Sequence, residues 1–276
     1  MSSPNDTAQT FSQRYDEKFI VPLETIRPLV LDETSQFSQM FQFDYIISDS
    51  YFNIVDNVYF DSPDLSSYHE HLENKVERVK LRLRQYNPDG LPEGITFFEV
   101  KEKREGKTFK SRILIRPDWL RPFLASGKFP ESELIQMNTD LKREKLSETV
   151  QTIYRLVNDE KYLPILRCTY QRYAFRLRES KKVRLTLDRD IRFIRLYYAI
   201  YPKQPYEVAV GTNDVIIEAK ISDPTFNHLI PMLESNFGQS RGVSKYCLGI
   251  FQTRDRFLNE TKDVTLRSLD RYRTIR

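Results

Sequence analysis

The sequence has few cysteines and histidines and no long apolar run, which are the features that disulfide frameworks, metal sites and membrane anchors require. Its 276 residues include only 2 Cys and 3 His. Cys168 and Cys247 are too few for a disulfide framework or a Cys-ligated zinc site, and they favour a reducing compartment, for which we expect the cytoplasm. Three histidines exclude a His-rich metal site. No run approaches 18 uncharged apolar residues, so we expect no transmembrane helix, and residues 1–20 lack the features of a secretory signal.

The charge is nearly balanced, and the aromatic content is high. A net charge of +4, from 43 Lys and Arg against 39 Asp and Glu, is too small for a general nucleic-acid coat, so we expect no nucleic-acid partner. With 18 Phe and 16 Tyr the chain can bury a core, unlike a disordered chain. No Ser/Gly-rich linker divides it. We predict a tail at residues 1–13, one domain at 14–251, and a charged helix or tail at 252–276.

Three neighbouring segments alternate strictly between polar and apolar residues, as strands do when one face is buried. They are Val79–Arg84, Thr96–Lys103 and Phe109–Ile115. Each has a polar, mostly basic face and an apolar face. Further strands are predicted at 14–21, 51–61, 166–175, 183–188 and 215–221, and helices at 23–31, 117–124, 141–157 and 224–236.

The basic faces have two interpretations. They can be the wet side of an ordinary antiparallel sheet. However, like charges opposite each other across strands are destabilising, and only Glu99, Asp188 and Glu218 offset them. A closed or nearly closed barrel would gather these charges around a polyanion, because Arg and Lys bind phosphate and carboxylates hold divalent cations. The basic residues are Lys80, Arg82, Arg84, Lys101, Lys103, Lys110, Arg112, Arg172, Arg184 and Lys220.

The order of nine short segments resembles one known family. The segments are RYDEKF, NVYFDSPDLSSYHEHL, KLRLRQY, FFEVKEK, FKSR, YQRYAF, VRLTLDRDI, VIIEAK and VSKYCLG, which span roughly residues 14–250. The ordered set resembles the VTC domain, the catalytic domain of vacuolar transporter chaperone polyphosphate polymerases, within the triphosphate tunnel metalloenzymes (CYTH-like superfamily). The resemblance implies an α+β fold, in which an antiparallel β-barrel of about eight strands forms a tunnel with helices packed outside.

The resemblance also implies an activity and a set of residues. The activity is transfer of the γ-phosphate of ATP to a growing inorganic polyphosphate chain, primed by pyrophosphate or phosphate and assisted by Mn²⁺ or Mg²⁺. The catalytic residues it marks are Lys18, Arg82, Arg84, Lys101, Arg172, Arg184 and Lys245. The further phosphate-binding residues are Arg112, Tyr170, Lys220 and Ser244. Glu218 matches the metal-binding glutamate, and Glu99 is a weaker metal candidate.

The first strand departs from the family pattern and keeps other functions open. The glutamate-rich ExExK of the superfamily is replaced by Asp16-Glu17-Lys18, where Asp16 shares the parity of Lys18 and Glu17 should point away. One alternative is a metal-dependent triphosphatase or polyphosphatase, with Glu99 or Asp16 as the base. The other is a non-catalytic polyphosphate- or nucleotide-binding module. A membrane protein as partner is also left open.

Some single residues have ordinary structural interpretations. Glu218 and Lys220 can form a surface ion pair of little energetic value. His69 and His71 follow a turn, and their alternation does not match a metal pair, so we assign them no role. Cys168 is expected to be a small buried thiol rather than a nucleophile.

Overall fold

The computed structural model describes residues 15–44, 52–86, 96–196, 207–209 and 214–254. Within them lies one antiparallel sheet with the strand order β1-β10-β8-β7-β3-β4-β5-β6, to which β2 adds beside β7 and β9 beside β8. The strands are β1 (Tyr15–Pro22), β2 (Phe41–Phe43), β3 (Asn53–Asp61), β4 (Arg78–Tyr86), β5 (Thr96–Arg104), β6 (Lys107–Ile115), β7 (Leu163–Leu177), β8 (Val183–Arg195), β9 (Glu207–Ala209) and β10 (Asp214–Ile221).

Helices connect and cover these strands. The α-helices are α1 (Leu23–Leu31), α2 (Gln36–Met40), α3 (Ser66–Leu72), α4 (Leu120–Ser126), α5 (Glu131–Met137), α6 (Arg143–Tyr154), α7 (Ile230–Phe237) and α8 (Lys245–Arg254). Short helical segments of other types are η1 (Pro117–Trp119), η2 (Arg155–Asp159) and η3 (Pro224–Leu229). No helix in the described part of the chain is both long and apolar enough to cross a membrane.

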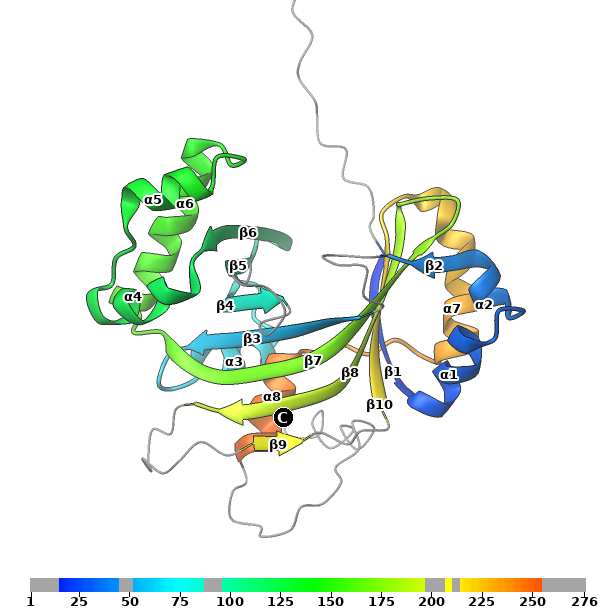
Figure 1. Cartoon of the computed structure of the whole chain (residues 1–276). Helices are drawn as coiled ribbons and strands as arrows, with labels where there is room; N and C mark the ends of the chain where they lie inside the picture. Colours follow the sequence, from blue (N-terminus) through cyan, green and yellow to red (C-terminus); the bar gives the residue numbers. More distant parts are fainter. Residues whose placement is uncertain (1–14, 45–51, 87–95, 197–206, 210–213, 255–276) are drawn as a thin grey trace, which may run out of the picture.

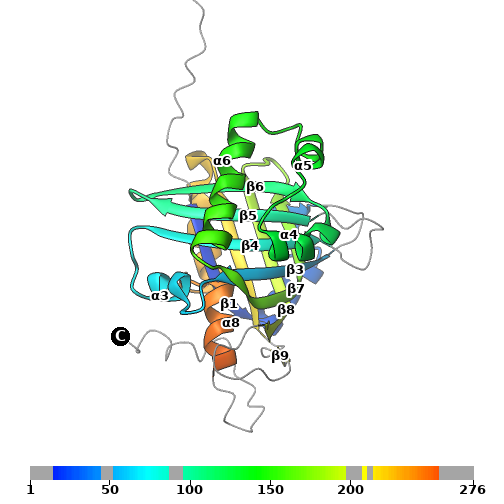
Figure 2. The same ribbon diagram turned by 90° about the vertical axis from the view of Figure 1, so that its left-hand side faces the viewer.

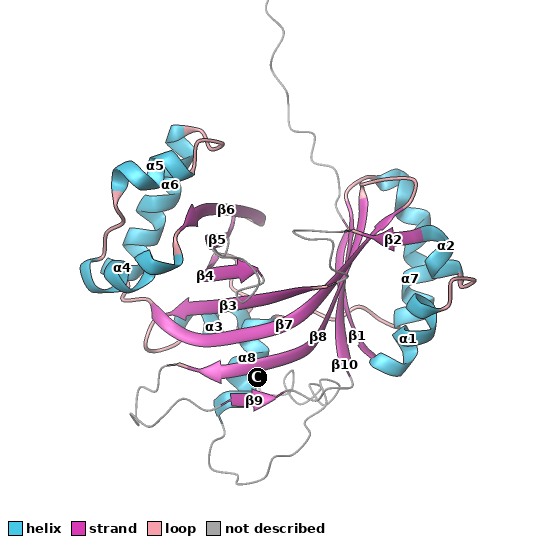
Figure 3. Cartoon of the chain, viewed as in Figure 1, coloured by secondary structure: helices cyan, strands magenta, loops and turns pink. Residues whose placement is uncertain are grey.

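The sheet curls strongly, with helices on its outer side (Figure 1). Helices α4, α5 and α6 lie outside the β4–β6 end, while α1, α2 and α7 lie outside the β1–β10 end (Figures 2 and 3). Among the described residues, β1 and β6 end the strand path, so the sheet curls like a tunnel wall without closing. The predicted α+β architecture of antiparallel strands with outer helices is confirmed. We call the inner side of the curl the concave face.

The outer face of β4–β6 is apolar, as the alternation predicts. Leu81, Phe98 and Ile113 are fully buried there and belong to one cluster with Phe123 of α4 and Ile153 of α6. The alternate residues of the same strands must therefore point to the concave face. At the other end of the sheet, a second cluster buries β1, β8 and β10 residues beneath α1 and α7.

Helix α8 packs against β7, β8 and α3 at one end of the concave face. Its Gly249 lies so close to the sheet that an added Cβ would be 2.4 Å from Leu166 Cδ2 and 2.7 Å from Phe193 Cδ1. Tyr246 donates its hydroxyl hydrogen to Asp61, which joins the helix to the end of β3. These contacts fix the segment that precedes and begins α8 against the strands.

The predicted elements differ from the observed ones at helix ends, and the sequence patterns did not predict helices α2, α5 and α8 or strands β2 and β9. The helix predicted at 117–124 begins with a 3₁₀ turn before α4, and the one predicted at 141–157 ends in a π-helical turn, η2. The sequence also predicts a turn at 87–90 and an extended segment at 191–201. The turn and residues 197–201 lie outside the described residues, and the start of the extended segment belongs to β8.

Candidate functional site

Strand register brings the predicted phosphate-binding residues onto the concave face. On one wall, Lys18 of β1 lies opposite Glu218 of β10, and Lys220 of β10 lies opposite Arg184 of β8. On the other wall, Arg82 of β4 lies opposite Glu99 of β5, which lies opposite Arg112 of β6. The same register aligns three lysines, Lys80, Lys101 and Lys110.

Glu99 collects three cations into what we call the Glu99 cluster. Arg82 Nε lies 2.6 Å and Arg84 Nε 3.8 Å from Glu99 Oε2, while Lys110 Nζ lies 3.0 Å from Oε1. Only 3% of the Glu99 side chain is exposed. Burial alone would raise its pKa, but the three cations outweigh burial and hold the pKa of Glu99 well below its usual range. The cluster therefore carries two net positive charges.

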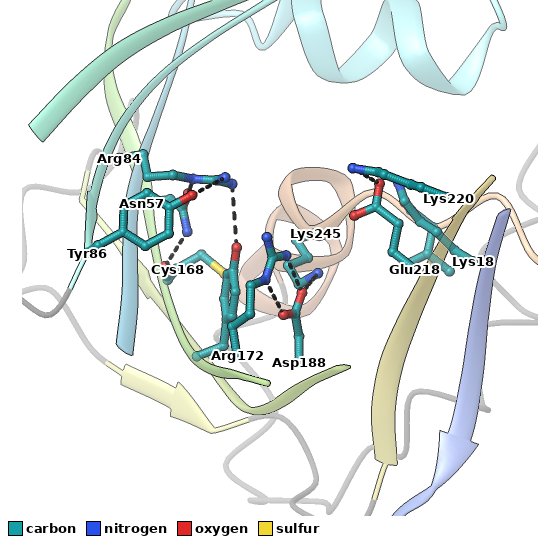
Figure 4. A network of polar contacts seen from close by, with 12 residues as sticks. Lys18, Asn57, Arg84, Tyr86, Cys168, Arg172, Asp188, Glu218, Lys220 and Lys245 are labelled. Carbon is teal, nitrogen blue, oxygen red and sulfur yellow. Dashed lines mark hydrogen bonds and ion pairs between the residues drawn. The ribbon is translucent and has the colours of Figure 1, made fainter. Parts of the chain in front are cut away.

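Asp188 forms a second cluster with cations from two different elements (Figure 4). Arg172 donates from Nε to Oδ1 at 2.6 Å and from Nη2 to Oδ2 at 2.7 Å. Lys245 Nζ, at the start of α8, lies 2.6 Å from Oδ2. Burial opposes charge on all three groups, but their mutual attraction lowers the pKa of Asp188 and raises the pKa of Arg172 and Lys245. We call this set the Asp188 cluster.

Glu218 and Lys220 form a third pair on the β1–β10 wall (Figure 4). Lys220 Nζ lies 3.0 Å from Glu218 Oε1, and Lys18 projects beside them. Burial would raise the pKa of Glu218, but Lys220, Lys18 and Arg172 keep it below its usual range. Glu218 is therefore an ionised carboxylate in a cationic environment, which disfavours the interpretation of this pair as an isolated surface ion pair.

Lysines Lys18, Lys80 and Lys101 meet near the segment before α8. Lys18 Nζ donates to the Val243 carbonyl at 2.9 Å, and Lys80 Nζ donates to Ser244 Oγ at 3.2 Å. Burial is the largest cause of a lowered pKa in each lysine, and the three repel one another. Lys18 donates to a carbonyl oxygen, and Lys80 donates to Ser244 Oγ and to Cys247 Sγ at 4.0 Å, so none of these hydrogen bonds pairs the ammonium with a carboxylate.

Arg84, a member of the Glu99 cluster, donates its hydrogen bonds to neutral groups. Its Nε donates to Asn57 Oδ1 at 2.9 Å, its Nη1 to the Tyr86 hydroxyl at 3.3 Å, and its Nη2 to the Tyr170 hydroxyl at 3.5 Å. Only 6% of the residue is exposed. A guanidinium fixed in this way keeps its charge available to an anion on the concave face.

Two of the predicted arginines lie at more open positions. Arg112 is exposed and stacks on Phe97, with its Cζ 4.4 Å from the ring centroid. Arg184 Nε lies 3.1 Å from Asp44 Oδ2, and 41% of its side chain is exposed. These two residues share the face with the clusters but belong to none of them.

Comparison with known proteins places the chain in a family. The family model described as the VTC domain matches residues 13–253. The chain belongs to the VTC domain family. Over 152 residues it is 28% identical to vacuolar transporter chaperone complex subunit 4 of Schizosaccharomyces pombe, covering 51% of this chain and 20% of the relative. It is 26% identical over 141 residues to subunit 2 of that yeast, covering 50% and 19%, so it spans about a fifth of these relatives.

Two solved structures are also similar to this VTC domain in their chain path. One is a putative adenylate cyclase from Bacillus halodurans, with 14% identity, a TM-score of 0.49, and coverage of 87% of this chain and 96% of that one. The other is a Pyrococcus horikoshii OT3 protein, with 12% identity, a TM-score of 0.45, and coverage of 87% and 100%.

The carboxylates of the VTC domain differ in their suitability for a divalent cation. No group of three His, Cys, Asp or Glu able to hold a metal occurs among the described residues. The oxygens of Glu99 and Asp188 are engaged by cations, whereas Glu218 pairs with one lysine through Oε1. Mg²⁺ is commonly held by one or two carboxylates together with substrate phosphates. Glu218, with Asp16 on the neighbouring strand, fits that donor chemistry when phosphate oxygens complete it.

The sequence patterns missed several residues that shape the site. Asp61 is fully buried and accepts from Ser67 N at 2.9 Å and Tyr68 N at 3.1 Å, so it holds the start of α3 as well as Tyr246. Its position before a Ser-Pro turn was an available signal for such capping. His71 of α3 lies among Lys80, Arg78, Lys18 and Lys101, and burial together with these cations lowers its pKa to about 3.

Proposed function

We propose that this VTC domain polymerises polyphosphate, transferring the γ-phosphoryl group of ATP to the end of an inorganic polyphosphate chain on the concave face. The observation that carries the proposal is the convergence of arginines and lysines from seven strands and α8 on that face. A polyanion would offset the repulsion that these side chains exert on one another. The relatives named as chaperone complex subunits belong to the same family and support a polyphosphate-related role.

The concave face offers separate sets of groups for the reacting phosphates. The Glu99 and Asp188 clusters supply arginines with directed N–H groups, which suit the triphosphate of ATP. The lysines near the start of α8 supply compact charges, which suit an acceptor chain whose length and register vary. We assign the triphosphate to Arg82, Arg84 and Arg172, with Lys101 and Lys18 toward the acceptor.

The transfer requires little covalent chemistry from the protein. A terminal oxygen of the acceptor forms a bond to the γ-phosphorus, the bond from the γ-phosphorus to the β,γ-bridging oxygen breaks, and ADP leaves with that oxygen. The acceptor phosphate is already anionic near neutral pH, so no side chain has to remove a proton. Positioning and charge neutralisation are then the main contributions of the protein.

A divalent cation, Mn²⁺ or Mg²⁺, would supply further charge neutralisation on the phosphate oxygens when bound beside Glu218. The low pKa of Glu218 keeps that carboxylate ionised at neutral pH, as a metal ligand must be. Glu99 is the weaker second candidate, because Arg82 and Lys110 already contact its carboxylate oxygens. Asp16 would be the additional carboxylate on the β1 side.

Hydrolysis of the triphosphate is the competing reaction, and one observation weighs against its simplest form. Water as acceptor benefits from a general base, and an effective base has a pKa near the working pH. The three cations around Glu99 hold its pKa far below that range, so Glu99 is a weak base. Asp16 remains the other candidate base for a triphosphatase. A third possibility is a module that binds polyphosphate or nucleotide without turnover.

Partners and location can be proposed on the same family grounds. The relatives' names describe subunits of a complex. We infer that this domain lies in the cytoplasm and acts there with other proteins. A membrane protein is one candidate partner. Its small molecules would be ATP, inorganic polyphosphate, and pyrophosphate or phosphate as primer.

The test is product analysis after incubation with ATP, Mn²⁺ and pyrophosphate. Polymerisation yields long polyphosphate and one ADP for each phosphate added, hydrolysis yields free phosphate, and a binding module consumes no ATP. Arg82→Gln should lower polyphosphate formation by about 10²-fold, by analogy with the loss of one oxyanion-stabilising donor. Arg167→Gln, a matched change on the outer face, should not. Equal loss in both variants would contradict the assignment of the concave face.

A further inference from the structure

Asp188 is a carboxylate that the proposed reaction does not itself require. It lies directly opposite Arg172 in the β7–β8 ladder, and only 1% of its side chain is exposed. Both oxygens are engaged, Oδ1 by Arg172 Nε and Oδ2 by Arg172 Nη2 and Lys245 Nζ. Such a carboxylate is poorly placed to take a metal ion or a proton, because each role would require breaking these contacts first.

The cations held by Asp188 share one aromatic ring. Arg172 Cζ lies 5.2 Å and Lys245 Nζ 4.9 Å from the ring centroid of Tyr170. The Tyr170 hydroxyl in turn accepts from Arg84 Nη2 at 3.5 Å. Asp188 therefore lies at one end of a chain of contacts that reaches Arg84, as the close-up shows (Figure 4).

The local backbone explains how Asp188 comes to this place. The β7–β8 pairing shifts between Thr169 and Gln171, and Asp190 has a φ of 50°. Asp188 and Ile191 are three residues apart, so on a regular strand they would point to opposite faces. The bulge lets both point to the face where Ile191 packs with the α8 residues. A bulge beside a set of charged side chains is a known way to aim a residue.

We propose that Asp188 is a positioning residue for phosphoryl transfer, which holds the guanidinium of Arg172 and the ammonium of Lys245 in one fixed arrangement toward the phosphates. Its bidentate contact uses two of the five N–H donors of Arg172, so three remain for phosphate oxygens. Its single negative charge leaves the cluster at +1. Asp188 itself touches no phosphate. The inference rests on the proposed function, of which it specifies one residue.

The chain contains a closely matched control for this role. Asp56 of β3 and Arg167 of β7 form another bidentate pair, with Arg167 Nε 3.1 Å from Oδ1 and Nη2 2.6 Å from Oδ2. Residue parity places this pair on the outer face of the two strands. Asp56→Asn therefore breaks the same kind of contact away from the phosphates.

The kinetic experiment compares Asp188→Asn, Arg172→Gln, the double variant and Asp56→Asn in polyphosphate formation from ATP with Mn²⁺. Asp188→Asn should lower kcat by about 10²-fold, the cost of a misplacement of around 1 Å, and change KM for ATP by less than about 3-fold. The double variant should lose less than about 3-fold beyond Arg172→Gln, since Asp188 acts mainly through Arg172. Unchanged kcat, or losses that multiply, would overturn the proposal.

A binding experiment gives a readout that does not depend on turnover. Calorimetric titration with inorganic tripolyphosphate should show Asp188→Asn binding at least as tightly as wild type, with and without Mn²⁺, because a negative charge is removed. A loss of more than about tenfold that appears only with Mn²⁺ would make Asp188 a metal ligand and overturn the proposal. If wild type makes no polyphosphate, the double-mutant cycle of Asp188→Asn and Arg172→Gln is measured in tripolyphosphate affinity instead, and it still tests the positioning role. An effect of Asp188→Asn on affinity that differs between the wild-type and Arg172→Gln backgrounds supports positioning, and the same effect in both backgrounds refutes it.

A stability control separates positioning from folding. If Asp188→Asn unfolds early in thermal melting, Asp188→Glu keeps the charge and shifts the carboxylate by one methylene. It should bind tripolyphosphate about as tightly as wild type, while its kcat stays below that of wild type. Recovery of both to wild-type values would mean that only the charge matters, which contradicts a role in fixing geometry.

Discussion

The two faces of β4, β5 and β6 are built from alternate residues of the same segments, yet they rest on opposite kinds of interaction. The outer face buries Leu81, Phe98 and Ile113 beneath α4 and α6, where the favourable term is removal of apolar area from water. The concave face holds Arg82 and Lys101, whose positive charges are only partly offset. We infer that one face maintains the fold, while the other keeps charge for an anion.

The largest effect we expect comes from the outer face. Phe98 is fully buried and packs against Phe60, Phe123 and Phe129, with ring centroids 5.2 to 6.0 Å away. Phe98→Ala should cost about 3–5 kcal/mol of unfolding free energy, because it leaves a cavity. Urea denaturation measures the loss. In the folded fraction kcat should stay near wild type, and a kcat that falls with stability intact would break the division between the faces.

Glu218→Gln should give the largest effect on the concave face. The substitution keeps the size of the side chain but removes the charge that would attract a divalent cation. We expect kcat with Mn²⁺ to fall by about 10²–10³-fold, while tripolyphosphate binding through the arginines is largely kept. Activity equal to wild type at limiting Mn²⁺ would remove Glu218 from the site.

Arg84→Lys tests whether directed hydrogen bonds, and not charge alone, matter on this face. Lysine keeps the charge but loses the planar fork that contacts Asn57, Tyr86 and Tyr170. Turnover should fall by about 10²-fold, with a stability loss of about 1 kcal/mol from the missing hydrogen bonds. Thermal melting and phosphoryl transfer are measured together. A variant that melts earlier but turns over normally would assign Arg84 to the fold.

The smallest expected effect concerns pH. Burial and nearby cations lower the folded-state pKa of His71 to about 3, below an unfolded value of about 6.5. The unfolded chain therefore takes up a proton first, and stability falls as pH drops from about 6.5 toward 3. His71→Gln should flatten this slope by up to about 1 kcal/mol per pH unit. His69→Gln is the control on the same helix, and equal slopes in wild type and His71→Gln would refute the placement.

Local patterns predicted the strands well, because alternation is a property of neighbouring residues. The segments that became β4, β5, β6 and β10 were found with the correct faces, so Arg82, Glu99 and Lys220 share a surface as expected. The ordered segments also identified the family correctly. The roles that the resemblance gives to single residues stay proposals, because geometry alone does not establish them.

Local sequence patterns could not predict contacts between segments that are distant in the sequence. The pairing of Lys245 with Asp188 depends on how α8 packs on β7 and β8, and the bulge near Asp190 changes parity in a way that alternation does not predict. The role of Asp61 in holding α8 likewise depends on a hydrogen bond from Tyr246, which lies 185 residues later in the sequence. Sequence spacing contains no direct measure of such packing.

A crystal structure of the chain with inorganic tripolyphosphate and Mn²⁺ tests the central claim most directly. We expect phosphate oxygens within hydrogen-bond distance of Arg82, Arg84 and Arg172 on the concave face, with the cation beside Glu218. Tripolyphosphate bound only on the outer surface, or on the concave face without these arginines, would contradict it.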